Sequence, residues 1–504
     1  MKKATQNFSE IIDGKSIFLT GSTGFLAKVF LEKILHIAPN VDKIYLHIRS
    51  ANFNHALSRL ENDVFSSPLF ASLYLDMQTE NGNQLLQLLR NKVRFVSGDI
   101  SKPRMGVSNE DYMMLLANVD FVVNSAASTD FMNPLDEAVA TNTLSVNNIV
   151  EFIKASKKAK LLHVSTCYIH ESQKELVPEC APLIPKKAKG RFPSSSIGIV
   201  DTQKILSTLD DIIQNINALE FKTKEKKKEA LIDAGYNFAR SHGWFNVYTF
   251  TKWLGESIIQ ENKNNITCVV VRPSIVESCL YGPTPGWIEG LKVADPLIYG
   301  VGINKIPYFP GSHSTILDLV PVDIVSNTMF LGLISIASTE EKSVNIYQAC
   351  SGGQKPLSLK LITDIVRDSF TTKPLTHRVM VPPMIFWAVT NSLLSLKKFF
   401  GHKKRKDSKT TNRMLQMTRI FEPYTNIKCS FDNSEALKIH SKLSERDRLQ
   451  FPITLEHLNW HHYLQKIHIP GLRKFVVDNR SGIPLNVTSQ TMRTEQFQSL
   501  KKVA

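Results

Sequence analysis

Tyr248 and Lys252 lie four residues apart in the stretch NVYTFTKWLGE (246–256), just ahead of an apolar run. On a helix this spacing places the two side chains on one face. In an enzyme that uses a nicotinamide cofactor, such a tyrosine donates a proton or a strong hydrogen bond to the carbonyl oxygen of the group that receives hydride. A lysine ammonium nearby would lower the pKa of the phenol and hold the cofactor ribose. The spacing alone proves little, because about one such pair is expected by chance in a chain of this composition.

Hydroxyl groups at the end of another apolar run offer a third member of this site. The run LLHVSTCYI (161–169) contains Ser165 and Thr166 near its end. Ligands of open α/β sheets bind at the carboxyl ends of strands, so a hydroxyl there could bond a reacting carbonyl. It could equally satisfy backbone groups at the strand end. We expect Thr166 to act beside Tyr248.

A glycine pattern near the N-terminus is typical of a phosphate cradle. In TGSTGFLAKVFLEKIL (20–35), Gly21, Gly24 and Ala27 form a variant of the dinucleotide fingerprint. The first glycine permits a tight turn, the second lets the backbone approach a pyrophosphate, and the small third residue packs the helix on the strand. Because the pattern follows an apolar run and opens an amphipathic helix, it predicts cofactor binding rather than a structural turn. The cradle, the strand-end hydroxyl and the tyrosine-lysine pair, in that order, indicate a catalytic site.

The end of the next apolar run selects the cofactor. An enzyme that uses NAD usually has an acidic side chain there to bond the ribose 2′-hydroxyl, whereas LHIRS (46–50) ends with Arg49 and Ser50. A guanidinium suits a 2′-phosphate, so NADPH is the predicted cofactor. The alternative is an ordinary surface arginine.

Short β-branched runs alternate with segments of helical character along the first 350 residues. This alternation predicts an α/β fold with a doubly wound parallel sheet and helices on both faces. The spacing breaks at about 170–245, a stretch too long for a simple connection, where we expect a helical insertion. Its lysines at 222, 224 and 226–228 form either a solvated helix face or a rim that attracts phosphate. The expected strands are 16–20, 43–49, 93–100, 119–126, 161–166, 267–274 and 343–349.

The bulk composition narrows the class of protein. A chain of 504 residues exceeds what one core usually supports, and 42% hydrophobic with 21% charged residues is typical of a soluble globular protein. The net charge of +15 implies an anionic partner, but zinc-finger spacings and aromatic RNA-binding signatures are missing, so we expect no nucleic acid. Six scattered cysteines and an N-terminus without an apolar signal segment predict reduced thiols, no metal cluster and a cytoplasmic location.

One late stretch, 379–406, joins a mostly apolar run to a basic cluster. The run is too short and too interrupted by Pro382, Pro383 and polar residues for a convincing transmembrane helix. It could lie at a membrane surface with its basic end facing anionic lipid, or it could be a buried helix followed by a solvated loop. Peripheral membrane contact is therefore one of two open alternatives.

These motifs together resemble the extended short-chain dehydrogenase/reductases, and more narrowly the alcohol-forming fatty acyl-coenzyme A (CoA) reductases, particularly soluble bacterial members. The resemblance runs from about residue 12 to 477 and includes the segments IYQACSGG and LNWHHYLQKIHIPGLRKF. A departure is Ala27, where the family commonly has glycine. Further matching segments are TGSTGFLAKVFLEKIL, NSAASTDF, HVSTCYI, NVYTFTKWLGE, VRPSIVES, PGWIEG, DLVPVDIVSN and FEPYTNIKCSFDNSEAL.

The resemblance implies a Rossmann-type NADPH-binding reductase domain over 1–365 and a mostly helical C-terminal domain over 366–504 that helps enclose the acyl chain. It makes Thr166, Tyr248 and Lys252 the catalytic residues. The implied cofactor-binding residues are Thr20, Gly21, Ser22, Thr23, Gly24, Phe25 and Leu26 at the pyrophosphate, Arg49 and Ser50 at the 2′-phosphate, Asp99 and Ile100 near adenine, and Asn124, Lys252 and Pro273 along the rest of the cofactor.

The implied reaction is the reduction of a long-chain acyl-CoA by two NADPH, through a bound aldehyde, to a primary alcohol and free CoA. An enzyme that stops at the aldehyde is the nearest alternative, because the catalytic residues are the same. A sugar-nucleotide epimerase or dehydratase would not need the insertion or the C-terminal domain. A sensor that only binds NADP(H) would not need the tyrosine and lysine. The sequence carries no signal for acyl length or oligomeric state.

Overall fold

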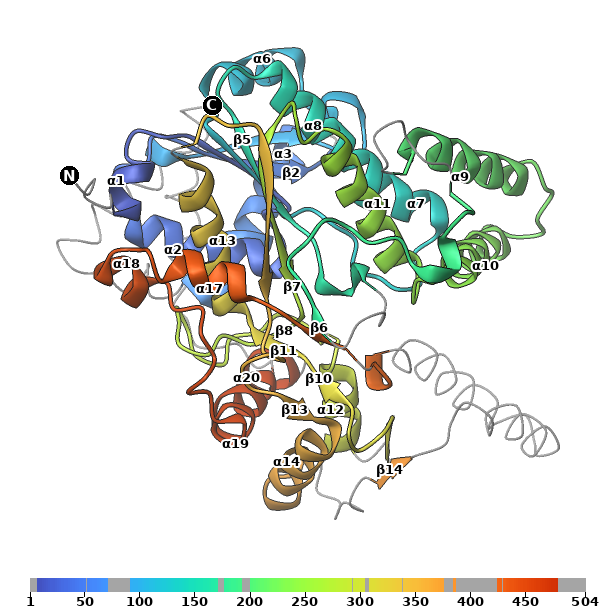
Figure 1. The fold of residues 1–504 in the computed structure, drawn as a ribbon, viewed down its shortest axis with the longest axis vertical. Helices are drawn as coiled ribbons and strands as arrows, with labels where there is room; N and C mark the ends of the chain where they lie inside the picture. Colours follow the sequence, from blue (N-terminus) through green and yellow to red (C-terminus); the bar gives the residue numbers. More distant parts are fainter. Residues whose placement is uncertain are drawn as a thin grey trace.

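A seven-stranded parallel sheet forms the centre of the protein (Figure 1). The strand order β3-β2-β1-β4-β5-β7-β12 starts in the middle, runs to one edge and then builds the other half, which is a doubly wound arrangement. The strands are β1 (Ile17–Thr20), β2 (Ile44–Arg49), β3 (Val93–Gly98), β4 (Phe121–Asn124), β5 (Lys160–Val164), β7 (Thr267–Pro273) and β12 (Ser343–Ala349). The computed structural model describes residues 7–50, 52–70, 91–170, 176–192, 200–291, 293–303, 308–337, 339–375, 384–386, 424–427 and 429–478.

All seven predicted strands are confirmed; six lie within the run expected to form them, and β5 begins one residue earlier, at Lys160. The central runs are largely apolar because both faces of the sheet are covered, whereas the edge strand β3 carries the exposed Arg94. In β1, for example, every residue is buried, and neighbouring side chains enter different cores. Leu19 packs in the cluster that includes Phe30 and Phe330, whereas Phe18 packs with Ile149 on the opposite face.

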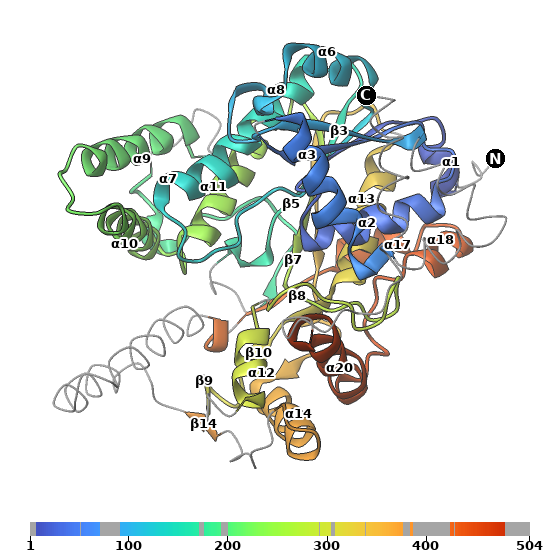
Figure 2. The ribbon, with the colours of Figure 1, turned by 180° about the vertical axis from the view of Figure 1, so that it is seen from behind.

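Helices cover the two faces of the sheet, as Figures 1 and 2 show from opposite sides. Apolar side chains at helical spacing explain this placement; buried residues of α8, for instance, recur at Val146, Ile149, Val150 and Ile153. The covering helices are α2 (Phe25–Ile37) and α13 (Val322–Ala337) on one face, and α8 (Ser145–Ala155) and α11 (Val247–Glu261) on the other.

The predicted insertion contains two long helices, α9 (Thr202–Asn217) and α10 (Lys224–His242), which lie to one side of the sheet in Figure 1. Each begins at a side-chain cap: Asp201 accepts from the Lys204 N–H, and Thr223 accepts from the Lys226 N–H. The helices pack through Ile205, Leu209 and Ala239 on a core that includes residues of α11. The insertion therefore supports the helix that carries Tyr248 and Lys252.

The C-terminal region is mostly helical, as predicted, and packs against the sheet domain (Figure 1). Phe451 stacks on Phe330 of α13 with ring centroids 5.1 Å apart. A short strand, β15 (Ser430–Phe431), pairs in parallel with β6 (Leu176–Val177). Helix α14 (Leu359–Thr372) crosses the predicted boundary at 365/366, and the helices beyond it are α17 (Ser434–His440), α18 (Glu445–Gln450), α19 (Trp460–His462) and α20 (Ile469–Leu472).

Only a small part of the stretch 379–406 lies within the described residues. Strand β14 (Met384–Phe386) pairs in parallel with β9 (Tyr308–Pro310); the rest of the stretch, with its predicted surface helix and basic cluster, lies outside the described residues. Among the helices that are described, none has both the length and the apolar character needed to cross a membrane. The six cysteines are all free thiols, and five of them are buried.

Candidate active site

The glycine cradle follows β1 at the carboxyl edge of the sheet. Gly21 has φ +66°, and a Cβ there would lie 2.7 Å from backbone atoms of Ser125 and Ala126. Only glycine fits this turn, because a side chain would meet both a left-handed backbone and a wall of main chain. Gly24 is exposed and caps the N-terminus of α2, where backbone N–H groups and the helix dipole favour an anion. The buried Ala27 then packs the helix on the sheet, so the residues present fit a dinucleotide pyrophosphate.

Three predicted cofactor-binding side chains face inward instead of the cradle. Thr20 donates to Asn124 Oδ1 over 2.7 Å, and the Asn124 amide lies 3.1 Å from His163 Nδ1. Burial, and then the charge of Lys252, hold the pKa of His163 well below its usual value, so its ring is a neutral acceptor. Ser22 Oγ donates to the carbonyl oxygen of His47 over 2.8 Å. These bonds fix the ends of β1, β2, β4 and β5, and the cradle is built mainly of backbone.

The end of β2 presents two arginines rather than one. Arg49 is exposed, and Ser50 donates its hydroxyl to the carbonyl oxygen of Asn52 over 2.8 Å. Arg59, which ends α3 (Phe53–Arg59), donates to the Arg49 carbonyl oxygen over 2.8 Å and to Thr23 Oγ1 over 3.3 Å. Arg59 thus joins the cradle to the end of β2. The sequence analysis missed it, although an arginine in the last turn of the next helix is a usable signal.

Asp99 and Ile100 follow β3 at the same edge. Burial opposes ionisation of Asp99, but two hydrogen bonds from Ser101 and the charges of Arg49 and Lys102 outweigh it and lower the pKa of this carboxyl. The effect of Arg49 on Asp99 indicates that both side chains lie near one end of the cradle. Ile100 is buried, and its carbonyl oxygen accepts from the Asn148 amide over 2.9 Å.

Thr166, Tyr248 and Lys252 come together beyond the end of β5. The cap of α11 is Asn246, whose Oδ1 accepts from the Thr249 N–H over 3.0 Å, so Tyr248 lies in the first turn and Lys252 one turn later. Lys252 Nζ donates to the carbonyl oxygen of Val164, the last residue of β5, over 2.7 Å. Thr166, two residues farther on, hydrogen-bonds the Tyr248 phenol. The structure therefore joins the three residues that the sequence analysis singled out.

The expected lowering of the Tyr248 pKa by Lys252 is wrong. Burial raises the pKa of Tyr248 to about 12, and the hydrogen bond with Thr166 only partly offsets it. Burial also lowers the pKa of Lys252 to about 8, against the opposing charge of Glu256. Burial is the largest cause at both residues, and the Lys252 ammonium donates to the Val164 carbonyl oxygen. Tyr248 is thus a protonated acid throughout the physiological range.

A buried ion pair fastens α11 to the sheet. Arg272 of β7 and Glu256 of α11 are both fully buried, with Nη2 and Oε2 2.6 Å apart and Nε at 3.0 Å from Oε1. A third nitrogen of the guanidinium lies 3.1 Å from His170 Nε2. Pro273, the residue after Arg272, accepts a 3.4 Å hydrogen bond from Thr166 Oγ1. The pair thereby fixes both the helix of Tyr248 and the strand beside Thr166.

Aromatic rings form a wall beside Tyr248. Phe131 lies 5.8 Å from the Tyr248 ring and stacks on Tyr424 at 5.2 Å. The Tyr424 hydroxyl accepts from the Asn246 amide over 3.0 Å, and its ring meets Tyr168 edge-on at 5.1 Å. Tyr424 belongs to the C-terminal region, so this region completes the apolar surroundings of Tyr248. Single aromatic residues carry no sequence signal for such a role.

A cavity of about 420 Å³ lies near the segment that follows Tyr424. Its wall combines hydroxyl and apolar groups. The lining residues are Ser312, Ser314, Thr315, Ile316, Asn426, Ile427, Cys429 and Ser430.

Comparison with known proteins shows the family of the chain. Two family profiles, both described as male sterility protein, match residues 19–329, as an NAD-binding domain, and residues 388–479. The chain is 31% identical to "Probable fatty acyl-CoA reductase 5" of Arabidopsis thaliana, with 92% of this chain and 98% of the relative covered. It is 30% identical to "Alcohol-forming fatty acyl-CoA reductase" of Simmondsia chinensis, with 93% and 98% covered.

Among solved structures, the terminal R domain of the myxalamid biosynthetic pathway has a TM-score of 0.60 at 16% identity, with 92% of each chain covered, and shares the fold. The profile over 19–329 spans more than half of the chain, and the plant relatives are matched over nearly their whole length. The chain therefore belongs to the fatty acyl-CoA reductase family and is an NAD(P)-binding reductase.

Proposed function

We propose that the protein is an NADPH-dependent reductase that converts long-chain fatty acyl-CoA to primary alcohol, of the type found in bacteria. The observation that carries this proposal is the meeting of Thr166, Tyr248 and Lys252 beside an aromatic wall completed by Tyr424. The alcohol-forming relative at 30% identity supports the four-electron product. The proposed domains are 1–365 for the cofactor and 366–504 for enclosing the acyl chain.

In the proposed mechanism, the glycine cradle and Lys252 would hold NADPH, which would supply hydride to the thioester carbonyl and then to the aldehyde. Tyr248 donates a hydrogen bond and then its proton to the carbonyl oxygen as negative charge develops there. Thr166 supports the same oxygen, and Lys252 holds the cofactor ribose. Collapse of the resulting thiohemiacetal breaks the C–S bond and releases the CoA thiol with its proton. Overall, one acyl-CoA, two NADPH and two protons give alcohol, free CoA and two NADP⁺.

The test measures how many NADPH molecules are consumed for each thiol released. Purified protein is mixed with NADPH and palmitoyl-CoA, and NADPH loss and free thiol release are followed together. Two NADPH consumed per thiol support the alcohol-forming reaction; one per thiol assigns the aldehyde-forming alternative. NADPH binding without turnover of any acyl thioester would assign the sensor alternative and overturn the proposal.

We place the protein in the cytoplasm, with peripheral membrane contact through 379–406. The basic residues Lys403, Lys404, Arg405 and Lys406 are the proposed contact with anionic lipid. Reversing their charges should reduce partition of the full chain onto vesicles containing phosphatidylserine, measured by flotation at low salt. Partition equal to that of the unmodified protein would contradict the electrostatic contact.

NADPH preference should depend on Arg59 as well as Arg49. Because Arg59 bridges Thr23 and the end of β2, Arg59→Ala should raise KM for NADPH by about 10- to 100-fold, the value of a charge-assisted hydrogen bond to phosphate. KM for NADH, which lacks the 2′-phosphate, should change little. Steady-state kinetics with both cofactors measures this. The control is Arg94→Ala, an exposed arginine near the amino end of β3; equal losses with NADPH and NADH would contradict the assignment.

Activity should fall as pH rises through about 8. The pKa of Lys252 is lowered to about 8, so above this pH the free enzyme loses the ammonium that holds the ribose, and kcat/KM for NADPH should fall about tenfold per pH unit. The phenol of Tyr248, with a pKa of about 12, stays protonated over this range. In Lys252→Met the alkaline fall should be missing from the residual activity. A fall at the same pH in this variant would assign it to another group.

The lowered pKa of Lys252 has the opposite effect on stability: activity should fall as pH rises, whereas the free energy of unfolding should increase. The pKa of Lys252 is about 8 in the folded state and 10.5 in the unfolded state. Between these pH values the unfolded state binds more protons, so the free energy of unfolding increases as pH rises. Below pH 8 the buried ammonium destabilises the fold. Lys252→Met should therefore raise the free energy of unfolding at pH 7 by about 1–3 kcal/mol, as measured by urea titration.

A further inference from the structure

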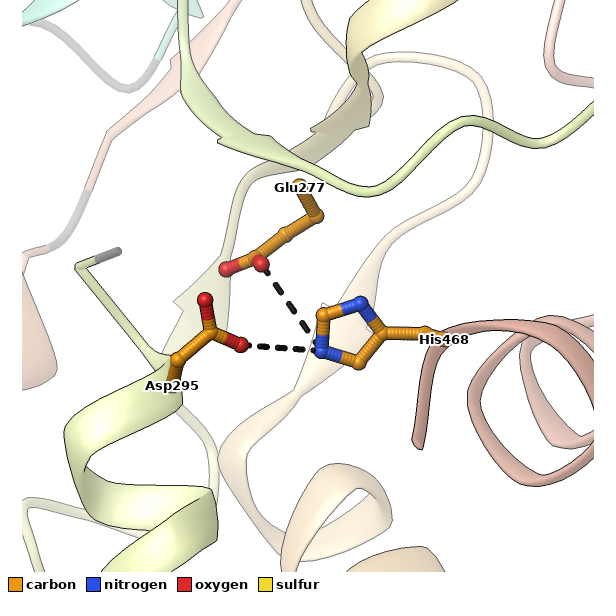
Figure 3. A group of neighbouring side chains, drawn as sticks. All are labelled: Glu277, Asp295 and His468. Atoms are coloured by element: carbon orange, nitrogen blue, oxygen red, sulfur yellow. Dashed lines mark ion pairs between the residues drawn. The ribbon is translucent and has the colours of Figure 1, made fainter. Parts of the chain in front are cut away.

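Three ionisable side chains from distant segments meet in the core (Figure 3). Glu277 ends β8 (Ile275–Glu277), Asp295 begins α12 (Asp295–Gly302), and His468 ends the helical segment Tyr463–His468. All three side chains are fully buried, and their potential ligand atoms lie within 4.8 Å of one another. In Figure 3 both carboxylates point toward one edge of the imidazole.

The distances fit a shared ion. His468 Nε2 lies 3.1 Å from Asp295 Oδ1 and 3.7 Å from Glu277 Oε2. Tetrahedral zinc with N and O ligands at about 2.0–2.2 Å separates its ligands by about 3.3–3.6 Å. Although Asp295 is so near, Nε2 makes no hydrogen bond with any residue that the structure describes. The buried nitrogen faces both carboxylates and forms an ion pair with each of them (Figure 3).

The other ring nitrogen of His468 is held as it would be in a metal ligand. Nδ1 lies 3.1 Å from Ser278 Oγ, which lies 3.3 Å from the Tyr463 hydroxyl, and that hydroxyl donates to the Ser278 carbonyl oxygen over 2.8 Å. Each proton in this series of hydrogen bonds has an acceptor when His468 Nδ1–H donates to Ser278 Oγ. This tautomer leaves the lone pair on Nε2, and an outer hydrogen bond of this kind is usual for ligating histidines.

The charges of the three side chains and the packing of the nearby backbone also favour a bound cation. Two carboxylates buried in contact are costly unless one of them takes up a proton or a cation compensates both, and a cation with the imidazole as a third ligand does the latter. The backbone nearby is tightly fixed: a Cβ on Gly286 would lie 2.6 Å from the carbonyl oxygen of Ile467, the residue before His468. The segment of His468 is thus held against the loop that follows β8, and the three ligands are brought together by the fold itself.

We propose that Glu277, Asp295 and His468 bind a zinc ion that fastens the C-terminal region to the sheet domain. The set of one imidazole and two carboxylates suits Zn²⁺, and the enclosed position makes the site structural rather than catalytic. This inference does not depend on the substrate of the reductase.

The first measurement is the metal content of the full-length protein, purified without chelators from cells supplied with zinc. About one Zn per chain is expected, and X-ray absorption should show N and O ligands at about 2.0 Å without sulfur. Glu277→Gln and His468→Gln should each lose the metal. The matched control is Glu179→Gln, a half-buried carboxylate outside the cluster that accepts the Glu435 N–H over 2.7 Å; it should keep the metal.

A second measurement uses the unmodified protein, so that a variant that fails to fold does not decide the matter. Removing the ion with dipicolinate should lower Tm by roughly 5 °C or more, and adding Zn²⁺ back should restore it. Metal-free protein whose Tm does not respond to Zn²⁺, or sulfur in the first shell, would overturn the proposal. In that case the three groups would share protons instead of a metal.

Discussion

The Tyr248→Phe variant is expected to lose about 10²- to 10⁴-fold in kcat, the usual contribution of a positioned proton donor. The substitution removes only the hydroxyl, which hydrogen-bonds Thr166 and is the proposed acid. The ring contact with Phe131 at 5.8 Å should persist, so KM for NADPH should change little. The measurement is steady-state NADPH oxidation with palmitoyl-CoA, with fluorescence titration of NADPH as the check on binding.

A matched control separates chemistry from packing. Tyr112→Phe removes a hydroxyl from a half-buried tyrosine of α6 (Asn109–Asn118), and the variant should keep full activity. Thr166→Val should also reduce kcat, but the double variant Thr166→Val/Tyr248→Phe should lose less than the product of the two single losses, because both hydroxyls serve one oxygen. A Tyr248→Phe variant with nearly full kcat would place the proton donor elsewhere.

The two reactive elements were predictable because their signals are local. The Gly21–Gly24 turn must be glycine for steric reasons that any reader of the sequence can apply, and the four-residue spacing of Tyr248 and Lys252 needs only a helix. The strands were predictable because a sheet covered on both faces requires continuous apolar runs. Thr166 was predictable as a site residue because it follows the end of a strand, where ligands of such sheets bind.

Features that depend on distant packing could not be predicted in this way. Tyr424 reaches the Tyr248 neighbourhood from another region of the chain, and the contact is set by how that region packs. Glu277, Asp295 and His468 are separated by 18 and 173 positions, so no spacing rule connects them. The direction of the Tyr248 pKa was also mispredicted, because a nearby lysine suggests a charge effect while burial, which proved larger, is known only from the fold.

Removal of one partner from the buried Arg272–Glu256 pair should be the largest stability effect in the chain. Glu256→Ala leaves a fully buried guanidinium without its carboxylate, which costs about 3–5 kcal/mol of unfolding free energy. Urea unfolding followed by tryptophan fluorescence measures the loss. The matched control is Asp364→Ala, which breaks a pair of the same 2.6 Å length between Lys360 and Asp364 on the surface. That change should cost less than about 1 kcal/mol, because water screens an exposed pair.

The same carboxylate tunes the active site, which gives the experiment a second readout. The charge of Glu256 raises the pKa of Lys252 against burial. Glu256→Gln keeps the shape but removes the charge, so the alkaline fall in kcat/KM for NADPH should move below pH 8, whereas the surface variant Asp364→Ala should leave it in place. A stability loss without movement of the pH profile would mean that the ion pair only holds α11 on β7. Movement of the profile would show that one buried charge both anchors the helix and keeps Lys252 protonated at neutral pH.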